Sequence, residues 1–260
     1  MPPKKFDSDG VPIAFMDEGE GFPTLLIHGF GSNRRVNWVS TSWSRDLLAA
    51  GRRVIAFDNR GHGESGKPHD PAAYRMEILA EDARRLLDHL GVEQADVIGY
   101  SMGARIAASL ALTHPERVRS AVFGGLGDAM VSRELFAPVE PLLAALAAKS
   151  LDEVNDPRGR TYRLFADQTG SDREALVACV LGARDRLTPH DAARISMPVL
   201  VAVGSEDAGA GSAEGLAALI PGAEAFTIPG RDHMKAVGDR AHKAAVLAFL
   251  ARQGRETSNQ

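Results

Sequence analysis

The stretch "ADVIGYSMGARIAASLALTHP", residues 95–115, changes its hydrophobic pattern in the middle. Residues 95–100 are an almost entirely apolar run, which is typical of a buried strand, whereas residues 101–115 have the apolar spacing of a helix. Between the two, Gly99, Ser101 and Gly103 fit the pattern G-x-S-x-G. Glycines on both sides allow a sharp turn that would expose the Ser101 hydroxyl at the carboxyl end of the strand. The stretch therefore predicts a strand–turn–helix unit with Ser101 as a candidate nucleophile, and a plain turn serine is the alternative.

The same alternation of short apolar runs and helical patterns extends along the chain. Further strands are predicted at 24–29, 53–58, 118–125, 198–204 and 223–230, and helices at 76–91, 212–222 and 240–254. Such alternation indicates βαβ units and a parallel sheet covered by helices on both faces. Asp9-Gly10 between two apolar runs predicts a hairpin at the start. The predicted fold is an α/β fold with a mostly parallel central sheet of about eight strands.

Residues 126–190 interrupt this rhythm, because they contain no convincing strand pattern. The segments "LFAPVEPLLAALAAKSLDEV" (135–154) and "REALVACVLGARDRL" (173–187) are helical in pattern. Long excursions between strands often serve as lids over a site. We therefore expect a core formed by residues 1–125 and 191–260 and a helical lid at 126–190.

A base and an acid follow Ser101 along the chain. Asp207 comes just after the predicted strand 198–204, and His233 lies in the loop after the strand 223–230. The carboxyl ends of parallel strands meet at one edge of a sheet, where ligands bind in open α/β folds. Asp128, after the strand 118–125, remains an alternative acid. His242, inside the last helical pattern, is expected on a solvated face.

A glycine-rich turn after the first parallel strand, His28-Gly29-Phe30-Gly31, could stabilise a negatively charged oxygen. The backbone N–H of Phe30 and that of Met102, which follows the candidate nucleophile, are the expected donors. Two such donors stabilise a tetrahedral anion because they point to where the charge develops. A purely structural turn is the alternative.

Together these motifs resemble the α/β-hydrolase fold superfamily, in its small bacterial serine-esterase branch. The matching pieces are "HGFG" (28–31), "DNRGHGESG" (58–66), "GYSMGA" (99–104), "GSED" (204–207) and "GRDH" (230–233). Asp232 departs from the pattern, since the family more often has a glycine before the histidine. The resemblance implies a serine hydrolase that needs no cofactor and no metal.

The expected activity is cleavage of small or medium uncharged carboxylic esters through an acyl-enzyme intermediate. Enol-lactonases, carbon–carbon bond hydrolases, thioesterases, perhydrolases and acyltransferases would share the same three residues, and a non-enzymatic ligand receptor is the alternative from another class. Trp38, Tyr100, Phe136 and Leu143 are the candidate pocket residues, with core packing as the alternative for such apolar side chains.

Composition restricts the partners. The 260 residues carry a formal net charge of -4, so we expect neither nucleic acid nor a membrane as partner. The single cysteine, Cys179, excludes an internal disulfide framework. We find no apolar run near the 20 or so residues that a membrane helix needs and no secretory pattern at the start. The expectation is a cytoplasmic monomer or homodimer that acts on a small-molecule ester.

Overall fold

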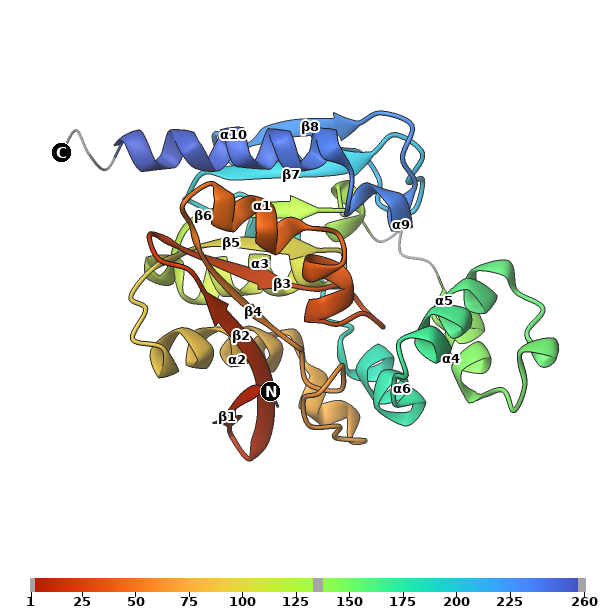
Figure 1. Cartoon of the computed structure of the whole chain (residues 1–260). Helices are drawn as coiled ribbons and strands as arrows, with labels where there is room; N and C mark the ends of the chain where they lie inside the picture. Colours follow the sequence, from red (N-terminus) through yellow and green to blue (C-terminus); the bar gives the residue numbers. More distant parts are fainter. Residues whose placement is uncertain (1–2, 133–137, 257–260) are drawn as a thin grey trace.

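The computed structural model describes residues 3–132 and 138–256, which are built around an eight-stranded sheet (Figure 1). The strand order is β1-β2-β4-β3-β5-β6-β7-β8. β1 and β2 pair antiparallel with each other, β2 pairs antiparallel with β4, and every other neighbouring pair is parallel. The mostly parallel sheet predicted from the sequence is thus confirmed. The strands are β1 (Lys4–Ser8), β2 (Val11–Glu18), β3 (Pro23–Ile27), β4 (Arg53–Phe57), β5 (Ala95–Tyr100), β6 (Val118–Gly124), β7 (Val199–Gly204) and β8 (Glu224–Ile228).

The antiparallel start is the hairpin that the Asp9-Gly10 pair predicts. Both residues have positive φ, 56° and 78°, and Ser8 pairs with Val11 directly across the turn. A two-residue loop with two positive φ angles matches the twist of the strands on either side, so the turn fixes their register.

Helices cover both faces of the sheet (Figure 1). α2 (Met76–His89) and α3 (Met102–Thr113) lie on one face, and α1 (Trp43–Ala49) and α10 (Arg240–Glu256) lie on the other. Alternation along a strand divides the core accordingly: Leu25 and Ile27 of β3 pack on the α2–α3 side, and Leu26 packs on the α1–α10 side. Because both faces are covered, the strands read as continuous apolar runs.

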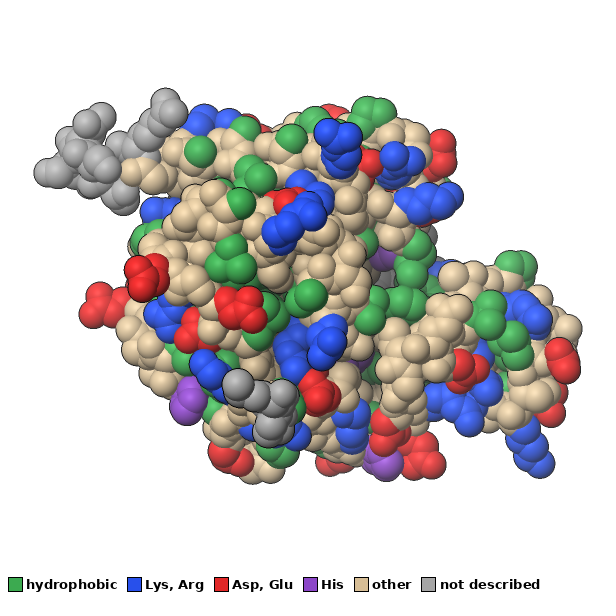
Figure 2. Space-filling model, viewed as in Figure 1, with side chains coloured by type: hydrophobic (Ala, Val, Ile, Leu, Met, Phe, Trp, Pro, Cys, Tyr) green, Lys and Arg blue, Asp and Glu red, His purple; other side chains and the backbone are tan. Residues whose placement is uncertain are grey.

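The segment between β6 and β7 is helical and contains no strand within its described residues, 126–132 and 138–190. It holds α4 (Glu140–Ala147), α5 (Pro157–Gln168), α6 (Arg173–Gly182) and α7 (Pro189–Ala192). Figure 1 shows α4, α5 and α6 grouped beyond the ends of the strands, and in the same view of the surface they form the lobe at the right (Figure 2). α5 begins with an Asp156 cap and Pro157, but its mixed polar pattern did not indicate a helix. The division into core and lid stays a prediction.

Short helices complete the chain. They are a π-helical turn (Arg35–Val39), 3-10 turns (Pro71–Tyr74, Pro115–Arg117, Asp128–Met130 and Leu151–Glu153), α8 (Ala213–Ala217) and α9 (His233–Ala236). α8 is shorter than the helix predicted at 212–222. In the part of the chain that the structure describes, no helix has both the length and the apolar character needed to cross a membrane.

Candidate active site

Ser101 occupies the sharp turn between β5 and α3. Its backbone has φ 55° and ψ -115°, a positive-φ conformation that is strained for a residue with a side chain. A Cβ atom at Gly99 would lie 2.2 Å from the Gly103 carbonyl oxygen, and one at Gly103 would lie 2.0 Å from the Ile27 carbonyl oxygen. Both glycines are therefore required for the close packing of the turn against itself and against β3.

Three predicted side chains meet at the carboxyl edge of the sheet. The Ser101 Oγ lies 2.9 Å from His233 Nε2, and His233 Nδ1 lies 2.6 Å from Asp207 Oδ2. Asp207 is buried, and an ionised carboxylate can only accept, so Nδ1–H donates to it. The neutral ring then presents Nε2 as an acceptor for the Ser101 hydroxyl. This arrangement can remove a proton from Ser101 and stabilise the imidazolium that forms.

The alternative acid, Asp128, and Asp232, which precedes His233, make other contacts. Asp128 Oδ1 accepts the Ser212 N–H at 2.8 Å, and Asp232 Oδ1 caps α9 by accepting the Lys235 N–H at 2.9 Å. Asp207 is thus the carboxylate in contact with the His233 ring among the described residues.

His242 is not on a solvated face, which corrects the expectation from its helical pattern. Its ring is buried between the sheet and α1, and Nδ1–H donates to the Ala236 carbonyl oxygen at 3.0 Å. Burial lowers the pKa of His242 to about 4, so its ring is neutral at pH 7. The face of α10 that carries His242 packs on Trp43, a helix–helix contact that the local sequence does not encode.

The turn after β3 lies directly against Ser101. A Cβ atom at Gly29 would lie 3.4 Å from the Ser101 Cβ, and the Gly29 N–H donates to Asn37 Oδ1 at 3.2 Å. Among the described residues, neither the Phe30 N–H nor the Met102 N–H donates to another group. Met102 begins α3, so its N–H has no acceptor within the helix. Neither N–H is occupied within the described part of the chain, and the oxyanion hole formed by the two groups stays a prediction.

The buried ring of His28 stabilises this turn by two hydrogen bonds. Its Nδ1–H donates to the Gly29 carbonyl oxygen at 2.8 Å, and its Nε2 accepts the Asn59 N–H at 2.9 Å. Complete burial lowers the pKa of His28 to about 4, which keeps the ring neutral and its two hydrogen bonds intact at pH 7. These contacts give His28 a structural role in the turn.

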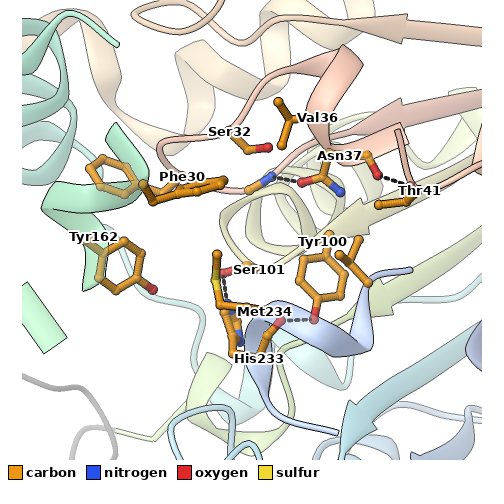
Figure 3. Close-up of a pocket in the computed structure, with 13 residues that line it drawn as sticks. Phe30, Ser32, Val36, Asn37, Thr41, Tyr100, Ser101, Tyr162, His233 and Met234 are labelled. Atoms are coloured by element: carbon orange, nitrogen blue, oxygen red, sulfur yellow. Dashed lines mark hydrogen bonds between the residues drawn. The ribbon is translucent and has the colours of Figure 1, made fainter. Parts of the chain in front are cut away.

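Two cavities meet at Ser101. The smaller has a volume of about 170 Å³ and lies between the turn after β3 and α9 (Figure 3). The larger, of about 490 Å³, lies between α3 and the helices α4–α6. Both cavities include Phe30 and Tyr162 in their walls. Residues of the smaller cavity that the sequence did not indicate are Ser32, Val36, Asn37, Thr41, Tyr162, Met234 and Val237.

The four candidate pocket residues have different positions. Tyr100 lines the smaller cavity, as expected. Trp38 is fully buried in the core and packs edge-to-face on Trp43, with ring centroids 6.0 Å apart, so it is a core residue and not a pocket residue. Leu143 is half-buried and lines neither cavity, whereas its neighbour Leu142 lines the larger one. Phe136 lies outside the described residues.

The described residues contain no group of three or more His, Cys, Asp or Glu side chains placed to hold a metal ion.

The structure thus combines a mostly parallel sheet with a serine, a histidine and an aspartate in contact at its carboxyl edge. This combination defines a class of α/β proteins. The chain has the α/β-hydrolase fold. A family model described as alpha/beta hydrolase fold matches residues 23–138.

Known relatives are similar to this chain over different lengths. A 2-hydroxymuconate semialdehyde hydrolase from Pseudomonas sp. (strain CF600) is 42% identical over 123 residues, 47% of this chain and 42% of that protein. The dihydrolipoyllysine-residue acetyltransferase component of an acetoin cleaving system from Pseudomonas putida is 32% identical over 251 residues, 89% of this chain and 64% of that protein. The chain thus spans less than two thirds of either relative.

A solved structure is similar over almost its whole length. It comes from a study of carboxylesterases of the Thaumarchaeon Nitrososphaera gargenis and has a TM-score of 0.78 at 26% sequence identity. The similarity covers 98% of this chain and 100% of that one.

Proposed function

We propose that this protein is a serine hydrolase that cleaves small or medium uncharged carboxylic esters through an acyl-enzyme intermediate. The observation that carries the proposal is the pair of hydrogen bonds that join Ser101, His233 and Asp207. Ser101 is the nucleophile, His233 the general base and acid, and Asp207 the residue that orients the imidazole.

In the first half of the reaction, His233 Nε2 takes the Ser101 proton while Oγ attacks the ester carbonyl carbon. The negative charge that forms on the carbonyl oxygen is bound by the N–H groups of Phe30 and Met102. His233 then gives its proton to the alcohol oxygen, the carbon–oxygen bond breaks and the acyl group stays on Ser101.

In the second half, a water molecule takes the place of the alcohol and gives a proton to His233 as it attacks the acyl carbon. Collapse of this second tetrahedral anion returns the proton to Ser101 and releases the carboxylic acid. Removing one of two anion donors typically costs about 3–4 kcal/mol of transition-state stabilisation, so we expect the Phe30 N–H to contribute on this scale.

The similarity to a carboxylesterase over the whole chain favours an ester substrate. The second candidate is hydrolysis of 2-hydroxymuconate semialdehyde or a similar compound, which the named relative favours over half of this chain. Both reactions would use the same nucleophile.

Phenyl acetate, phenyl butyrate and 2-hydroxymuconate semialdehyde form the test panel, with Ser101→Ala as the control and a fluorophosphonate as the probe of the nucleophile. We expect turnover of the phenyl esters and labelling by the probe, both lost in Ser101→Ala. Turnover of the semialdehyde alone would favour the second candidate. Failure of the wild type with every substrate and with the probe would overturn the proposal.

A further inference from the structure

The two cavities at Ser101 differ in size. A cavity of about 150 Å³ lined by apolar side chains is large enough to hold benzene. The smaller cavity, at about 170 Å³, therefore accepts a group of about six non-hydrogen atoms. The larger cavity, at about 490 Å³, lies in the range of ordinary ligand pockets and accepts a longer group.

The position of His233 decides which half of an ester enters which cavity. His233 lines the smaller cavity and does not line the larger one among the described residues. Its Nε2 must deliver a proton to the leaving oxygen, so that oxygen has to lie within hydrogen-bond reach of the ring. The alcohol group that this oxygen carries consequently extends into the smaller cavity, and the acyl group extends into the larger one.

Asn37 lines the smaller cavity and carries a buried hydrogen-bond donor. The side chain is 5% exposed, and its Oδ1 accepts the Gly29 N–H, which fixes the orientation of the amide. Its Nδ2 has no hydrogen-bond partner among the described residues. Figure 3 shows the amide oxygen on the Gly29 side and the nitrogen facing Tyr100. Buried donors are almost always satisfied, and this donor belongs to a residue of the cavity wall, so an oxygen atom of a ligand could supply its missing partner.

We propose, on the basis of the ester hydrolase function above, that the smaller cavity is an alcohol site for a short group with an oxygen acceptor. The substrates are esters of alcohols with about six non-hydrogen atoms or fewer that contain an ether, hydroxyl or carbonyl oxygen. Asn37 Nδ2 donates to that oxygen, and the acyl group lies under α4–α6. Asn37 is thus a residue that determines specificity.

A matched pair of substrates tests the donor in the wild type. Butyl hexanoate and 2-methoxyethyl hexanoate have alcohol groups of nearly equal length and differ by one ether oxygen. After division by the ratio of their alkaline hydrolysis rates, we expect kcat/KM to favour the methoxyethyl ester by about fivefold, the effect of one neutral hydrogen bond. Equal corrected values would overturn the assignment of the donor.

A pair of variants tests the residue. Asn37→Asp keeps the acceptor for the Gly29 N–H but replaces the donor, and we expect it to abolish the preference for the methoxyethyl ester. Asn33→Asp is the matched control, since Asn33 lies in the same turn and its Oδ1 accepts the Arg35 and Val36 N–H groups. Within the described part of the chain, its side chain makes no other hydrogen bond and lines neither cavity. A preference that persists in Asn37→Asp, or is lost equally in both variants, would overturn the proposal.

The size limit has its own test. Val36→Phe narrows the smaller cavity, so we expect kcat/KM to fall at least tenfold for butyl hexanoate relative to methyl hexanoate. It should not change the preference among methyl esters of longer acids. The reverse result, a changed acyl preference, would place the acyl group in the smaller cavity and refute the proposal.

These outcomes are separable from failure of the proposed function. A wild type that hydrolyses all the hexanoates with Ser101 dependence but does not discriminate refutes the alcohol site alone. A wild type that hydrolyses none of them and does not react with a fluorophosphonate refutes the ester hydrolase, and the alcohol site with it.

Discussion

Ser101 combines the reactive hydroxyl with a strained backbone. A positive-φ conformation of this kind costs about 1–3 kcal/mol for a residue with a Cβ atom, and glycine adopts it without that cost. The strain arises from the backbone conformation of the turn, so it does not depend on the presence of the hydroxyl group.

We therefore expect two inactive variants of different stability. Ser101→Ala retains the backbone strain, whereas Ser101→Gly relieves it. Part of this gain in stability is offset, because glycine raises the conformational entropy of the unfolded chain. Urea unfolding should show Ser101→Gly to be more stable than Ser101→Ala by about 1 kcal/mol. If Ser101→Ala proves the more stable of the two, the turn is not strained.

His242 provides a second prediction for a single residue. Burial lowers its pKa from 6.5 to about 4, so between these values the unfolded chain binds a proton that the folded chain does not. The stabilisation is present above pH 6.5 and is lost as the pH falls towards 4. From pH 7 to pH 5, this residue alone lowers the free energy of unfolding by about 2 kcal/mol.

Urea unfolding at pH 7 and pH 5 measures the effect. His242→Gln keeps a donor for the Ala236 carbonyl oxygen but does not titrate, so we expect its stability to change by about 2 kcal/mol less than that of the wild type between the two pH values. His190→Gln, at an exposed position, should leave the change as it is. Identical changes in His242→Gln and the wild type would contradict the buried neutral ring.

At the scale of elements, α9 depends on its neighbours. With four residues it has too few internal hydrogen bonds to be stable alone. Side chains from other elements bond to carbonyl groups at both ends of α9. Tyr100 Oη–H donates to the carbonyl oxygen of His233 at 2.6 Å, and the Trp43 indole N–H donates to that of Val237, just after the helix, at 2.7 Å. His233 is the first residue of α9, so these contacts position its ring.

Tyr100→Phe removes one of these contacts and leaves the ring. Burial raises the pKa of Tyr100, so its hydroxyl remains a donor throughout the working pH range. We expect kcat to fall about tenfold with little change in KM, because small displacements of a catalytic group slow the chemistry more than binding. A raised KM at unchanged kcat would assign Tyr100 to the pocket wall alone.

Elements were predictable where local pattern decides them. The runs around Ser101 predicted β5 and α3 almost to the residue, because an apolar strand followed by two glycines and an amphipathic helix leaves few alternatives. α1 carries no comparable signal. Its buried residue Trp43 packs on Trp38 of the π-helical turn Arg35–Val39, a tertiary contact that the local pattern does not show. The position of Trp38 therefore depends on tertiary contacts.

At the scale of the molecule, one buried carboxylate joins three segments. Asp82 of α2 accepts from the Ser8 hydroxyl of β1 at 2.6 Å and from the Arg60 guanidinium at 2.6 and 2.7 Å. All three side chains are nearly inaccessible to solvent. Removing one partner of such a pair strongly lowers the free energy of unfolding, because it leaves the other charge buried without a counter-ion.

We expect Asp82→Ala to lower the free energy of unfolding by about 3–5 kcal/mol in urea denaturation. Glu224→Ala is the control, because the Glu224–Arg252 pair is half exposed and should contribute at most about 1 kcal/mol. Comparable losses in the two variants would show that burial of the Asp82 pair is not the cause.

The sequence predicted which residues of the site lie at the same edge of the sheet, because that depends only on their following parallel strands. Ser101, Asp207 and His233 each follow a parallel strand, so the sheet brings them to one edge. Asn37 had no comparable signal, because its role depends on the fold of the turn after β3 and on which amide atom is left without a partner. Contacts between segments far apart in sequence are the part that local patterns do not determine.

Cys179 has a practical consequence. The thiol is 1% exposed, lies 3.8 Å from the Met102 sulfur, and has its pKa raised by burial to about 12, so almost no thiolate forms at neutral pH. Because Cys179 is the single cysteine of the chain, we expect the wild type to react very little with maleimides. A cysteine introduced on the surface of α5 and another on α1 can carry a fluorescent donor and acceptor, which would report the distance between the helical segment and the sheet during turnover.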